Sequence, residues 1–255
     1  MQPRERHEAI LQKLGAREMM TISELMQEFG VSIETVRRDL NHLEREKKIK
    51  RVYGGAILYN HTVASTGVAF RLSENVSEKQ MIGYECAKLI HSGDTVYLGP
   101  GTTVLQVAKA LRNIPDLTII TNSMHTAMEF IDTDANLYFI GGKMNTRDGN
   151  TAYLFPENTW KHFHATKAIV GAGGISTEYG ITDYTFPEGY GIRQMLEQAL
   201  QIIVVADNSK FGLIHSYSTC SLARVNHIIT GSAQKDSILK DFAPYRHQFI
   251  FAESK

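Results

Sequence analysis

Apolar residues recur at helical spacing near the start of the chain. Ile10, Leu11 and Leu14 fall on one face of a helix predicted over residues 4–14. A second helix is predicted over residues 22–29, because the threonine and the glutamate of "TISE" have the spacing of a capping box. The chain therefore begins with two short amphipathic helices.

A glycine turn separates the second helix from a third. Gly30 supplies a left-handed turn, and Ser32 caps the helix that follows. Val36, Leu40 and Leu43 stand at positions i, i+4 and i+7 and are expected to be buried. This burial leaves five side chains facing outward: Ser32, Thr35, Arg37, Arg38 and His42. Two helices joined by a short turn, the second with arginines outside, form a helix-turn-helix suited to a major groove.

A hairpin is predicted after the third helix, because basic and apolar residues alternate in "KKIKRVYGGAI" up to two glycines. Placed there, it would be a wing lying on the DNA backbone, and we predict a winged helix-turn-helix domain over residues 1–58. Side chains near the start of the third helix would meet base edges, while flanking basic residues would hold phosphates. The predicted DNA-contacting residues are Ser32, Thr35, Arg37, Arg38, His42, Lys50, Arg51, Tyr53 and Gly54.

Charge is distributed in agreement with this interface. The whole chain has 27 basic and 27 acidic residues, so its net charge indicates no general affinity for nucleic acid. Between residues 37 and 51, by contrast, basic residues outnumber acidic ones, which makes a local electrostatic footprint. A solvated helix face carries similar runs of charge, so charge alone does not establish DNA binding.

Strand and helix patterns alternate from Ser77 onward, which is typical of a largely parallel sheet flanked by helices. Strands are predicted over residues 95–98, 117–121, 136–140, 167–171, 202–206, 227–230 and 248–251. Helices are predicted over residues 79–91, 103–112, 123–131 and 188–200. We therefore expect an α/β domain over residues 77–255, joined to the first domain by a polar linker over residues 59–76.

Small, hydroxyl, amide and lysine side chains follow five of these strands. Open α/β sheets bind ligands at the carboxyl ends of their strands, near a topological switch point. The five segments are 99–103, 121–123, 141–143, 171–174 and 207–210. Together they predict a site for a polyhydroxylated anionic ligand, although each alone has the composition of an ordinary turn between a strand and a helix.

The segment "GPGTT", which follows the first of these strands, has the features of a phosphate-binding loop. Its glycines allow close approach of the backbone, and the N–H groups of the next helix favour an anion. Thr102 and Thr103 would add hydroxyl donors, and Lys210 or Lys143 the countercharge. Pro100 removes one backbone donor from the loop.

The stretch "VSIETVRRDLNHLEREKKIKRVYGGA", residues 31–56, resembles the N-terminal signature of the DeoR family of bacterial transcriptional regulators. The second half, from about Ser77 to Gly231, resembles the family's sensor domain at "GTT", "TNS", "GG", "GITDYTFPE" and "ADNSKFG". The resemblance implies a relation to ribose-5-phosphate isomerase, in which the equivalent of the "GTT" loop binds phosphate. It also implies a repressor that senses a sugar phosphate, or a similar metabolite, of the pathway it controls.

The chain departs from the family pattern inside the predicted ligand site. Many members have D-S-G-T-T and G-A-D-G where this chain has Gly99 and Gly173 in place of the aspartates. The segment near Glu188 retains only its first acid and Arg193. We therefore expect an unusual ligand for the family. The predicted effector-binding residues are Gly99, Gly101, Thr102, Thr103, Thr121, Asn122, Ser123, Gly141, Gly142, Gly173, Glu188, Asp207 and Lys210.

A sensor is favoured over an enzyme. An aldose-ketose isomerase needs a base within hydrogen-bond reach of the substrate, and the acids that remain are Asp183, Glu188 and Asp207. Asp207 would orient the nearby lysine, take a ligand hydroxyl or cap the following turn. Glu188 would hold a hydroxyl or complement a helix dipole. The alternatives are a phosphosugar isomerase with an accessory DNA-binding module, and a regulator whose second domain only oligomerises.

The remaining sequence features are consistent with a cytoplasmic regulator. No apolar run approaches the roughly 20 residues of a membrane span, and the charged N-terminus is not a secretory signal. Cys86 and Cys220 lie outside any metal or redox motif, and the pair His162 and His164 lacks accompanying ligands, so we predict neither metal nor cofactor. The expected partners are double-stranded operator DNA, a phosphorylated sugar or related effector, and further copies of the chain in a dimer or tetramer.

Overall fold

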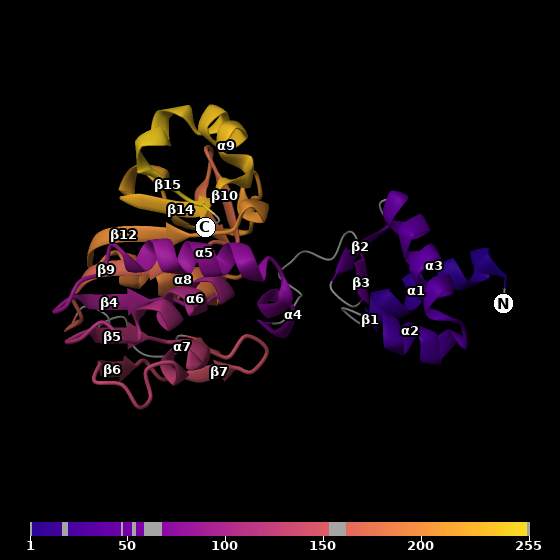
Figure 1. Ribbon diagram of the computed structural model, residues 1–255, viewed down its shortest axis with the longest axis horizontal. Coiled ribbons are helices and arrows are strands. Elements are labelled where there is room, and N and C mark those ends of the chain that lie inside the picture. The colour runs from indigo at the N-terminus through magenta and orange to yellow at the C-terminus, as the bar shows by residue number, and fades with distance from the viewer. Residues whose placement is uncertain are drawn as a thin grey trace. The chain divides into compact units, whose positions relative to one another are not determined.

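The computed structural model describes residues 2–16, 20–46, 48–52, 55–58, 68–152 and 162–253. The chain divides into two compact units, Met1–Glu74 and Asn75–Lys255. Figure 1 shows the elements of each unit. We describe each unit by itself.

The first unit consists of short helices and a small antiparallel sheet. Its elements are α1 (Pro3–Ala16), β1 (Met20–Thr21), α2 (Ile22–Phe29), α3 (Ile33–Arg45), β2 (Ile49–Val52), β3 (Gly55–Leu58) and α4 (Val68–Ser73). The three predicted helices and the hairpin are confirmed. The sheet has the order β1-β3-β2, and its two-residue strand β1 is too short to leave a periodic signal in the sequence.

The apolar positions predicted to be buried form the core of this unit. Val36, Leu40 and Leu43 on α3 are at most 1% exposed and pack with residues of α1, α2 and the sheet. The capping box before α2 is also formed: the Thr21 hydroxyl accepts from the Glu24 N–H, and the Glu24 carboxylate accepts from the Thr21 N–H. Local sequence signals thus fix both ends of α2 and the buried face of α3.

The predicted linker contains regular structure. Residues 59–67 lie outside the described residues, but α4 occupies residues 68–73 and the next helix begins at Val76. The weak periodicity of this stretch did not reveal α4, because six residues span less than two helical turns.

The second unit is an α/β domain, as expected. Its elements are α5 (Val76–Ala87), β4 (Thr95–Leu98), α6 (Thr102–Leu111), β5 (Thr118–Thr121), α7 (Met124–Met128), β6 (Asn136–Phe139), β7 (Lys143–Asn145), β8 (Asn150–Ala152), β9 (Ala165–Val170), β10 (Gly174–Ser176), β11 (Gly180–Asp183), α8 (Phe186–Leu196), β12 (Ala199–Val205), β13 (Tyr217–Cys220), β14 (His227–Gly231), α9 (Lys235–Asp241) and β15 (Phe249–Ala252). Seven strands form a sheet in the order β15-β14-β12-β9-β4-β5-β6, and every pair in it is parallel.

Both faces of this sheet are buried, and alternate residues of each strand point to opposite faces. Val96 and Leu98 of β4 join the core beneath α5 and α6, which lie side by side on one face (Figure 1). Tyr97, between them in sequence, joins the core on the other face, together with Met195 and Leu196 of α8. All seven predicted strands of the sheet are confirmed.

The structure differs from the sequence prediction at several elements of the second unit. The helices predicted over residues 79–91 and 123–131 end earlier, at Ala87 and Met128, and α9 was not predicted. The helix predicted over residues 188–200 ends at Leu196, and β12 begins at Ala199, because the apolar pattern continues without a breaker from one element into the next. A small antiparallel sheet, β10-β11-β13, and the hairpin β7-β8 were not predicted. The strands of both are only three or four residues long, too short for a clear alternation.

Candidate DNA interface and effector site

Helices α2 and α3 form the predicted helix-turn-helix. Gly30 ends α2 in the left-handed region with φ 61°, and its N–H donates to the Met26 carbonyl. Ser32 caps α3, its Oγ accepting from the Thr35 N–H at 3.3 Å. These two local signals set where α3 begins and therefore which residues occupy its first turns.

The predicted DNA-reading residues lie on the outer side of α3. Ser32, Arg37, Arg38 and His42 are exposed, and Thr35 is half-buried. Arg37 and Arg38 sit in the first half of the helix and are exposed, whereas Val36 and Leu40 of the same turns are buried. The two guanidinium groups are thus presented to solvent by a helix whose other face is fixed in the core.

A buried ion pair, which the sequence reading missed, fastens α3 to α1. Arg6 is 7% exposed and Asp39 4% exposed, and the guanidinium donates twice to the carboxylate, at 2.6 and 3.1 Å. Burial raises the pKa of Asp39, but hydrogen bonds from Arg6 and His7 outweigh it and hold the pKa below its ordinary value. Asp39 is one of the acids within the basic stretch 37–51, and its buried pair with Arg6 holds the helix in place.

His42 belongs to the same network. Its ring stacks on that of His7 with centroids 4.7 Å apart, and its Nε2 lies 3.2 Å from the Glu46 carboxylate. His7 in turn lies 2.9 Å from Asp39. A predicted DNA contact is therefore already packed against α1, and its side chain is oriented before any DNA is bound.

Lys50 and Arg51 lie on β2, the first strand of the wing, and differ in their surroundings. Lys50 is exposed, as a phosphate contact requires. Arg51 is tied to α3, since its N–H donates to Glu44 and its guanidinium donates to Asn41 Oδ1 at 2.6 Å. The other two predicted wing contacts, Tyr53 and Gly54, lie outside the described residues.

The topological switch of the large sheet falls between β4 and β9. From β4 the chain adds β5 and β6 on one side and, later, β9, β12, β14 and β15 on the other. The loops after β4 and β9 therefore diverge at the point where α/β sheets bind ligands. Gly99, the first residue after β4, remains bonded to β9, because its N–H donates to the Ile169 carbonyl at 2.9 Å.

The "GPGTT" segment runs from β4 into α6 across this switch point. Gly101 has φ 132°, a conformation open to glycine, and is the N-cap of α6. Thr102 and Thr103, in the first turn of α6, are each 7% exposed. The predicted strand, glycine turn and helix start are thus present, and the free N–H groups of a ten-residue helix begin at the switch point.

The packing also explains why Gly99 and Gly173 carry no side chain. A Cβ added at Gly99 would lie 3.2 Å from Val170 Cγ1, tighter than ordinary contact. A Cβ at Gly173 would lie 3.0 Å from the Thr182 carbonyl oxygen and 3.1 Å from His215 Cδ2. The His215 ring occupies the space that a side chain at residue 173 would need.

The residues after β5 have structural partners. Thr121 is fully buried and its Oγ1 accepts from the Ser123 N–H, while Ser123 caps α7. Asn122 joins two strands: its Oδ1 accepts from the Tyr97 hydroxyl at 3.2 Å, and its Nδ2 donates to the Thr151 carbonyl at 3.0 Å. These residues shape the rim of the site and have local roles without any ligand.

Glu188 is held by amides rather than left free. It lies in the first turn of α8, and its Oε1 accepts from Asn145 and Asn150 at 3.2 and 3.3 Å. Its second oxygen accepts from the Thr185 hydroxyl. Asn150 is 3% exposed and was missed by the sequence reading, because the hairpin that carries it was not predicted.

Asp207 and Lys210 follow β12. Asp207 is 1% exposed and caps the short turn Asn208–Lys210 by accepting from the Ser209 N–H, which is one of the roles expected for it. Burial raises the pKa of Asp207, but the charges of Lys210 and Lys79 and the hydrogen bonds from Ser209 outweigh it, so the pKa lies below its ordinary value. Lys210 is half-buried beside this carboxylate.

The five segments predicted to bind the effector do not all lie close together, because the strands that they follow are spread across the sheet. Strands β6 and β12 are four positions apart in the sheet, which corresponds to about 19 Å. Gly141 and Gly142, exposed after the edge strand β6, thus stand far from the Asp207 turn. The sheet brings the ends of β4 and β9 together as neighbours and places the ends of β5 and β12 one strand further out on either side.

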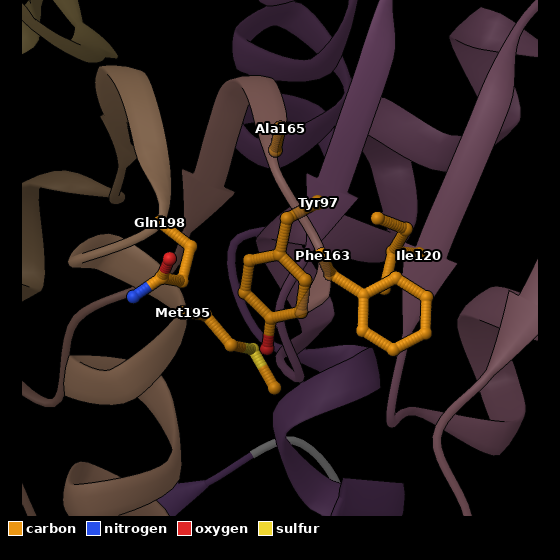
Figure 2. A pocket seen from close by; sticks show the side chains of 6 residues that line it. All are labelled: Tyr97, Ile120, Phe163, Ala165, Met195 and Gln198. Atoms are coloured by element: carbon orange, nitrogen blue, oxygen red, sulfur yellow. The ribbon is translucent and has the colours of Figure 1, made fainter. Parts of the chain in front are cut away.

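A small, largely apolar pocket lies near the site but is not formed by it. Tyr97, Ile120, Phe163, Ala165, Met195 and Gln198 line the pocket. Figure 2 shows the Tyr97 ring between the side chains of Met195 and Phe163. None of the predicted effector-binding residues lines this pocket, although the Tyr97 hydroxyl donates to Asn122.

The described residues also bear on metal binding and on membrane insertion. No group of three or more histidine, cysteine or acidic side chains among them is arranged to hold a metal ion. His162 and His164 precede β9 and are exposed. No described helix is long and apolar enough to cross a membrane.

Two family models match this chain. The DeoR-like helix-turn-helix domain matches residues 6–62, and the DeoR C-terminal sensor domain matches residues 74–232. The matched ranges follow the two units of the structure and contain every residue predicted to contact DNA or effector.

Full-length relatives carry regulatory names. The chain is 30% identical to the HTH-type transcriptional regulator GolR of Listeria innocua over 243 residues, covering 95% of this chain and 96% of that protein. It is 36% identical to the HTH-type transcriptional repressor GlcR of Bacillus subtilis over 90% of this chain and 89% of the relative. It is 29% identical to the glycerol-3-phosphate regulon repressor of Escherichia coli over 94% of this chain and 95% of the relative.

Proposed function

The chain belongs to the DeoR family of helix-turn-helix transcriptional regulators, and we propose that it represses a carbohydrate uptake or catabolism operon under the control of a phosphorylated sugar or related metabolite. The names of its relatives support this assignment. One is a glycerol-3-phosphate regulon repressor and another the repressor GlcR, and both match nearly the whole chain. As a DNA-binding regulator it acts in the cytoplasm.

The proposal that the chain binds operator DNA rests on one observation. Arg37 and Arg38 are exposed on a helix whose inner face is buried in the core. In the proposed docking, α3 enters the major groove and these arginines meet base edges. Ser32 and Thr35 lie at the leading end, and Lys50 holds a phosphate from the wing. Tyr53 and Gly54 contact the backbone beside it, and two copies bind repeated half-sites.

Arg51 and His42 have a second role in this proposal. Both are bonded within the unit, Arg51 to Asn41 and Glu44, and His42 to Glu46. Arg51 positions the wing relative to α3, and His42 packs α3 against His7 of α1. Their contacts with DNA are therefore made by side chains whose orientation is fixed in advance, which lowers the entropy cost of binding.

The effector site is proposed at the switch point between β4 and β9. The phosphate lies on the backbone N–H groups of Gly101, Thr102 and Thr103, with Lys210 as countercharge. Asn122 and Gly173 line the sugar side, and Thr121, Ser123 and Glu188 hold the rim in place through the bonds already described. Gly141 and Gly142 belong to the periphery, and Asp207 acts by orienting the Lys210 turn.

The site is proposed to bind without catalysis. Isomerisation requires a free base beside the substrate. Glu188 accepts from two asparagines, and Asp207 caps its own turn. Asp183, the third remaining acid, accepts from the Tyr184 N–H. A coupled isomerisation assay on pentose and hexose phosphates tests the alternative, an isomerase with an accessory DNA-binding module. Turnover above background that is lost in Glu188→Gln would establish that alternative.

Thermal denaturation of the full chain with a panel of phosphorylated sugars tests the effector. A compound at one hundred times its dissociation constant should raise stability by about 2.7 kcal/mol. The rise should disappear in Lys210→Ala and persist in Lys143→Ala, because Lys143 follows the edge strand β6. A domain that only oligomerises would respond to no compound.

A further inference from the structure

The first turn of α5 is bonded to the turn that carries Lys210. We propose that this contact couples the effector site to the segment that leads back to the DNA-binding unit. The inference rests on the proposed function, since it takes Lys210 to bind the phosphate of the effector. We call the contact between residues 75–79 and 207–210 the α5 clamp.

Three hydrogen bonds join the two sides of the clamp. Asn75, immediately before α5, donates from Nδ2 to Asp207 Oδ1 at 3.0 Å. Glu78 Oε1 accepts from the Asn208 N–H at 2.8 Å and also from Asn208 Nδ2. The side chains of the helix start thus hold both the carboxylate and the backbone of the turn.

The backbone around the clamp is shaped for this contact. Asn75 has φ 51°, a left-handed conformation that is uncommon outside glycine. At the end of β14, a Cβ on Gly231 would lie 2.5 Å from Glu78 Oε1, so only glycine admits the carboxylate there. The helix start is therefore fitted to this position rather than loosely apposed to it.

The clamp contains buried charges that respond to an anion at Lys210. Asp207 is 1% exposed and Lys79, on the first turn of α5, is 4% exposed, so water and salt screen them weakly. Asp207 interacts with both Lys79 and Lys210. A phosphate bound to Lys210 competes with Asp207 for that lysine. The interactions of Asp207 with Lys79 and Asn75 then become stronger. The result is a tighter hold on the start of α5.

The clamp stands where the chain passes from one unit to the other. Asn75 is the first residue of the second unit, and Glu74 is the last residue of the first. Helix α4 ends at Ser73, two residues before the clamp. A change in the first turn of α5 is transmitted to α4 through this short length of backbone.

Hydrogen exchange of the full chain, with inorganic phosphate as the probe, tests the inference. In the wild type, saturating phosphate should slow amide exchange at residues 100–104 and 207–210. It should also slow exchange at residues 68–80 by about fivefold or more, the lower range of ordinary allosteric couplings.

Two variants break the clamp from the α5 side. Asn75→Gly removes the amide donor while keeping the left-handed conformation accessible. Glu78→Gln replaces the charged acceptor of the two Asn208 hydrogen bonds with a neutral amide oxygen, which weakens both bonds. Both should keep the slowing at residues 100–104 and lose it at residues 68–80. Glu85→Gln is the matched control, because Glu85 lies on the same helix and pairs with Lys88 instead; it should behave as the wild type.

The outcomes separate this inference from the proposed function. Slowing at residues 100–104 without slowing at 68–80 in the wild type overturns the inference and leaves the effector site intact. Slowing at 68–80 that persists in both Asn75→Gly and Glu78→Gln also overturns it. If phosphate slows exchange nowhere, the phosphate site fails, and the inference fails with it.

Discussion

Each unit fixes its functional surface with one buried aspartate, but the two aspartates are held differently. Asp39 is paired with Arg6, and the pair joins two helices of the DNA-binding unit. Asp207 is shared between two lysines, one of which, Lys210, is proposed to bind the effector. The helix proposed to read DNA is thus held by a pair that no proposed ligand disturbs, whereas the turn that carries Lys210 is held by charges for which the proposed anion would compete.

The strongest test of this comparison is removal of Asp39. Asp39→Ala removes the carboxylate that accepts two hydrogen bonds from the buried Arg6 guanidinium, and should lower the free energy of unfolding of the first unit by about 3–5 kcal/mol. Urea denaturation followed through NMR signals of the α1 and α3 core measures the loss. Glu8→Ala, which removes an exposed acid of α1, is the control and should have little effect. Equal effects of the two variants would show that the buried pair does not hold α3.

The corresponding change in the second unit is Asp207→Asn. This variant keeps the shape of the side chain but removes the charge beside Lys79 and Lys210, and should destabilise the second unit by about 1–3 kcal/mol. The loss is smaller than for Asp39, because Lys210 is only half-buried. Thermal denaturation measures it, with the exposed residue change Asp134→Asn as control. A loss as large as that of Asp39→Ala would remove the contrast between the two aspartates.

The arginines of α3 test the surface that Asp39 supports. Arg37→Ala and Arg38→Ala should each weaken operator binding by about 1–3 kcal/mol if the side chain reads a base. Lys50→Ala should weaken binding to all sequences alike and reduce the salt dependence by about one charge. Fluorescence anisotropy at several salt concentrations distinguishes these patterns. Unchanged operator affinity in both arginine variants would rule out the proposed docking.

A smaller effect is expected at the start of α3. Ser32→Ala removes the cap that accepts from the Thr35 N–H and should cost about 1 kcal/mol of stability in the first unit. Ser32→Asn, which can still cap the helix, should restore most of it. If Asn fails to rescue stability, the hydroxyl matters for a reason other than capping.

The free energy of unfolding should change little near neutral pH and should fall as the solution becomes more acidic. The pKa values of Asp39 and Asp207 are lowered in the folded state, so each carboxylate contributes stability above its unfolded pKa of about 4. That contribution is lost as the pH falls below about 4, through the lowered folded values. Denaturation of wild type and Asp39→Asn between pH 7 and pH 3 checks this. The two curves should converge in acid, and parallel curves would contradict the sign.

The sequence predicted the first unit better than the second unit's site for a physical reason. The capping box of α2, the Gly30 turn and the buried face of α3 are local signals, read within a few residues. The Arg6–Asp39 pair spans 33 positions in sequence, and nothing near Asp39 distinguishes it from the exposed acids around it. A buried charge pair is visible only once the helices that carry it are packed.

The strand ends of the second unit also depend on contacts between distant residues, which local sequence patterns do not predict. All seven strands were predicted from their apolar runs, but their order in the sheet was not. That order places β4 beside β9 and puts Gly141 and Gly142 at the edge. Lys79 is the first residue of the helix predicted over residues 79–91, and it is only 4% exposed because α5 packs its first turn on the Asp207 turn. The residue types that follow a strand indicate that its loop can contribute to a ligand site. The order of the strands in the sheet decides which of these loops lie close enough to form one site.

The most direct test of the account is operator binding by the full chain in the presence of phosphorylated sugars. DNA selected from the genome by the wild-type protein should be bound specifically, and at least one phosphorylated compound should change that affinity by about 5- to 150-fold. Lys210→Ala should retain DNA binding and lose the response, while the Arg37→Ala, Arg38→Ala double variant should lose specific binding. Specific DNA binding that no phosphorylated compound alters, or that Lys210→Ala leaves fully responsive, would contradict the account.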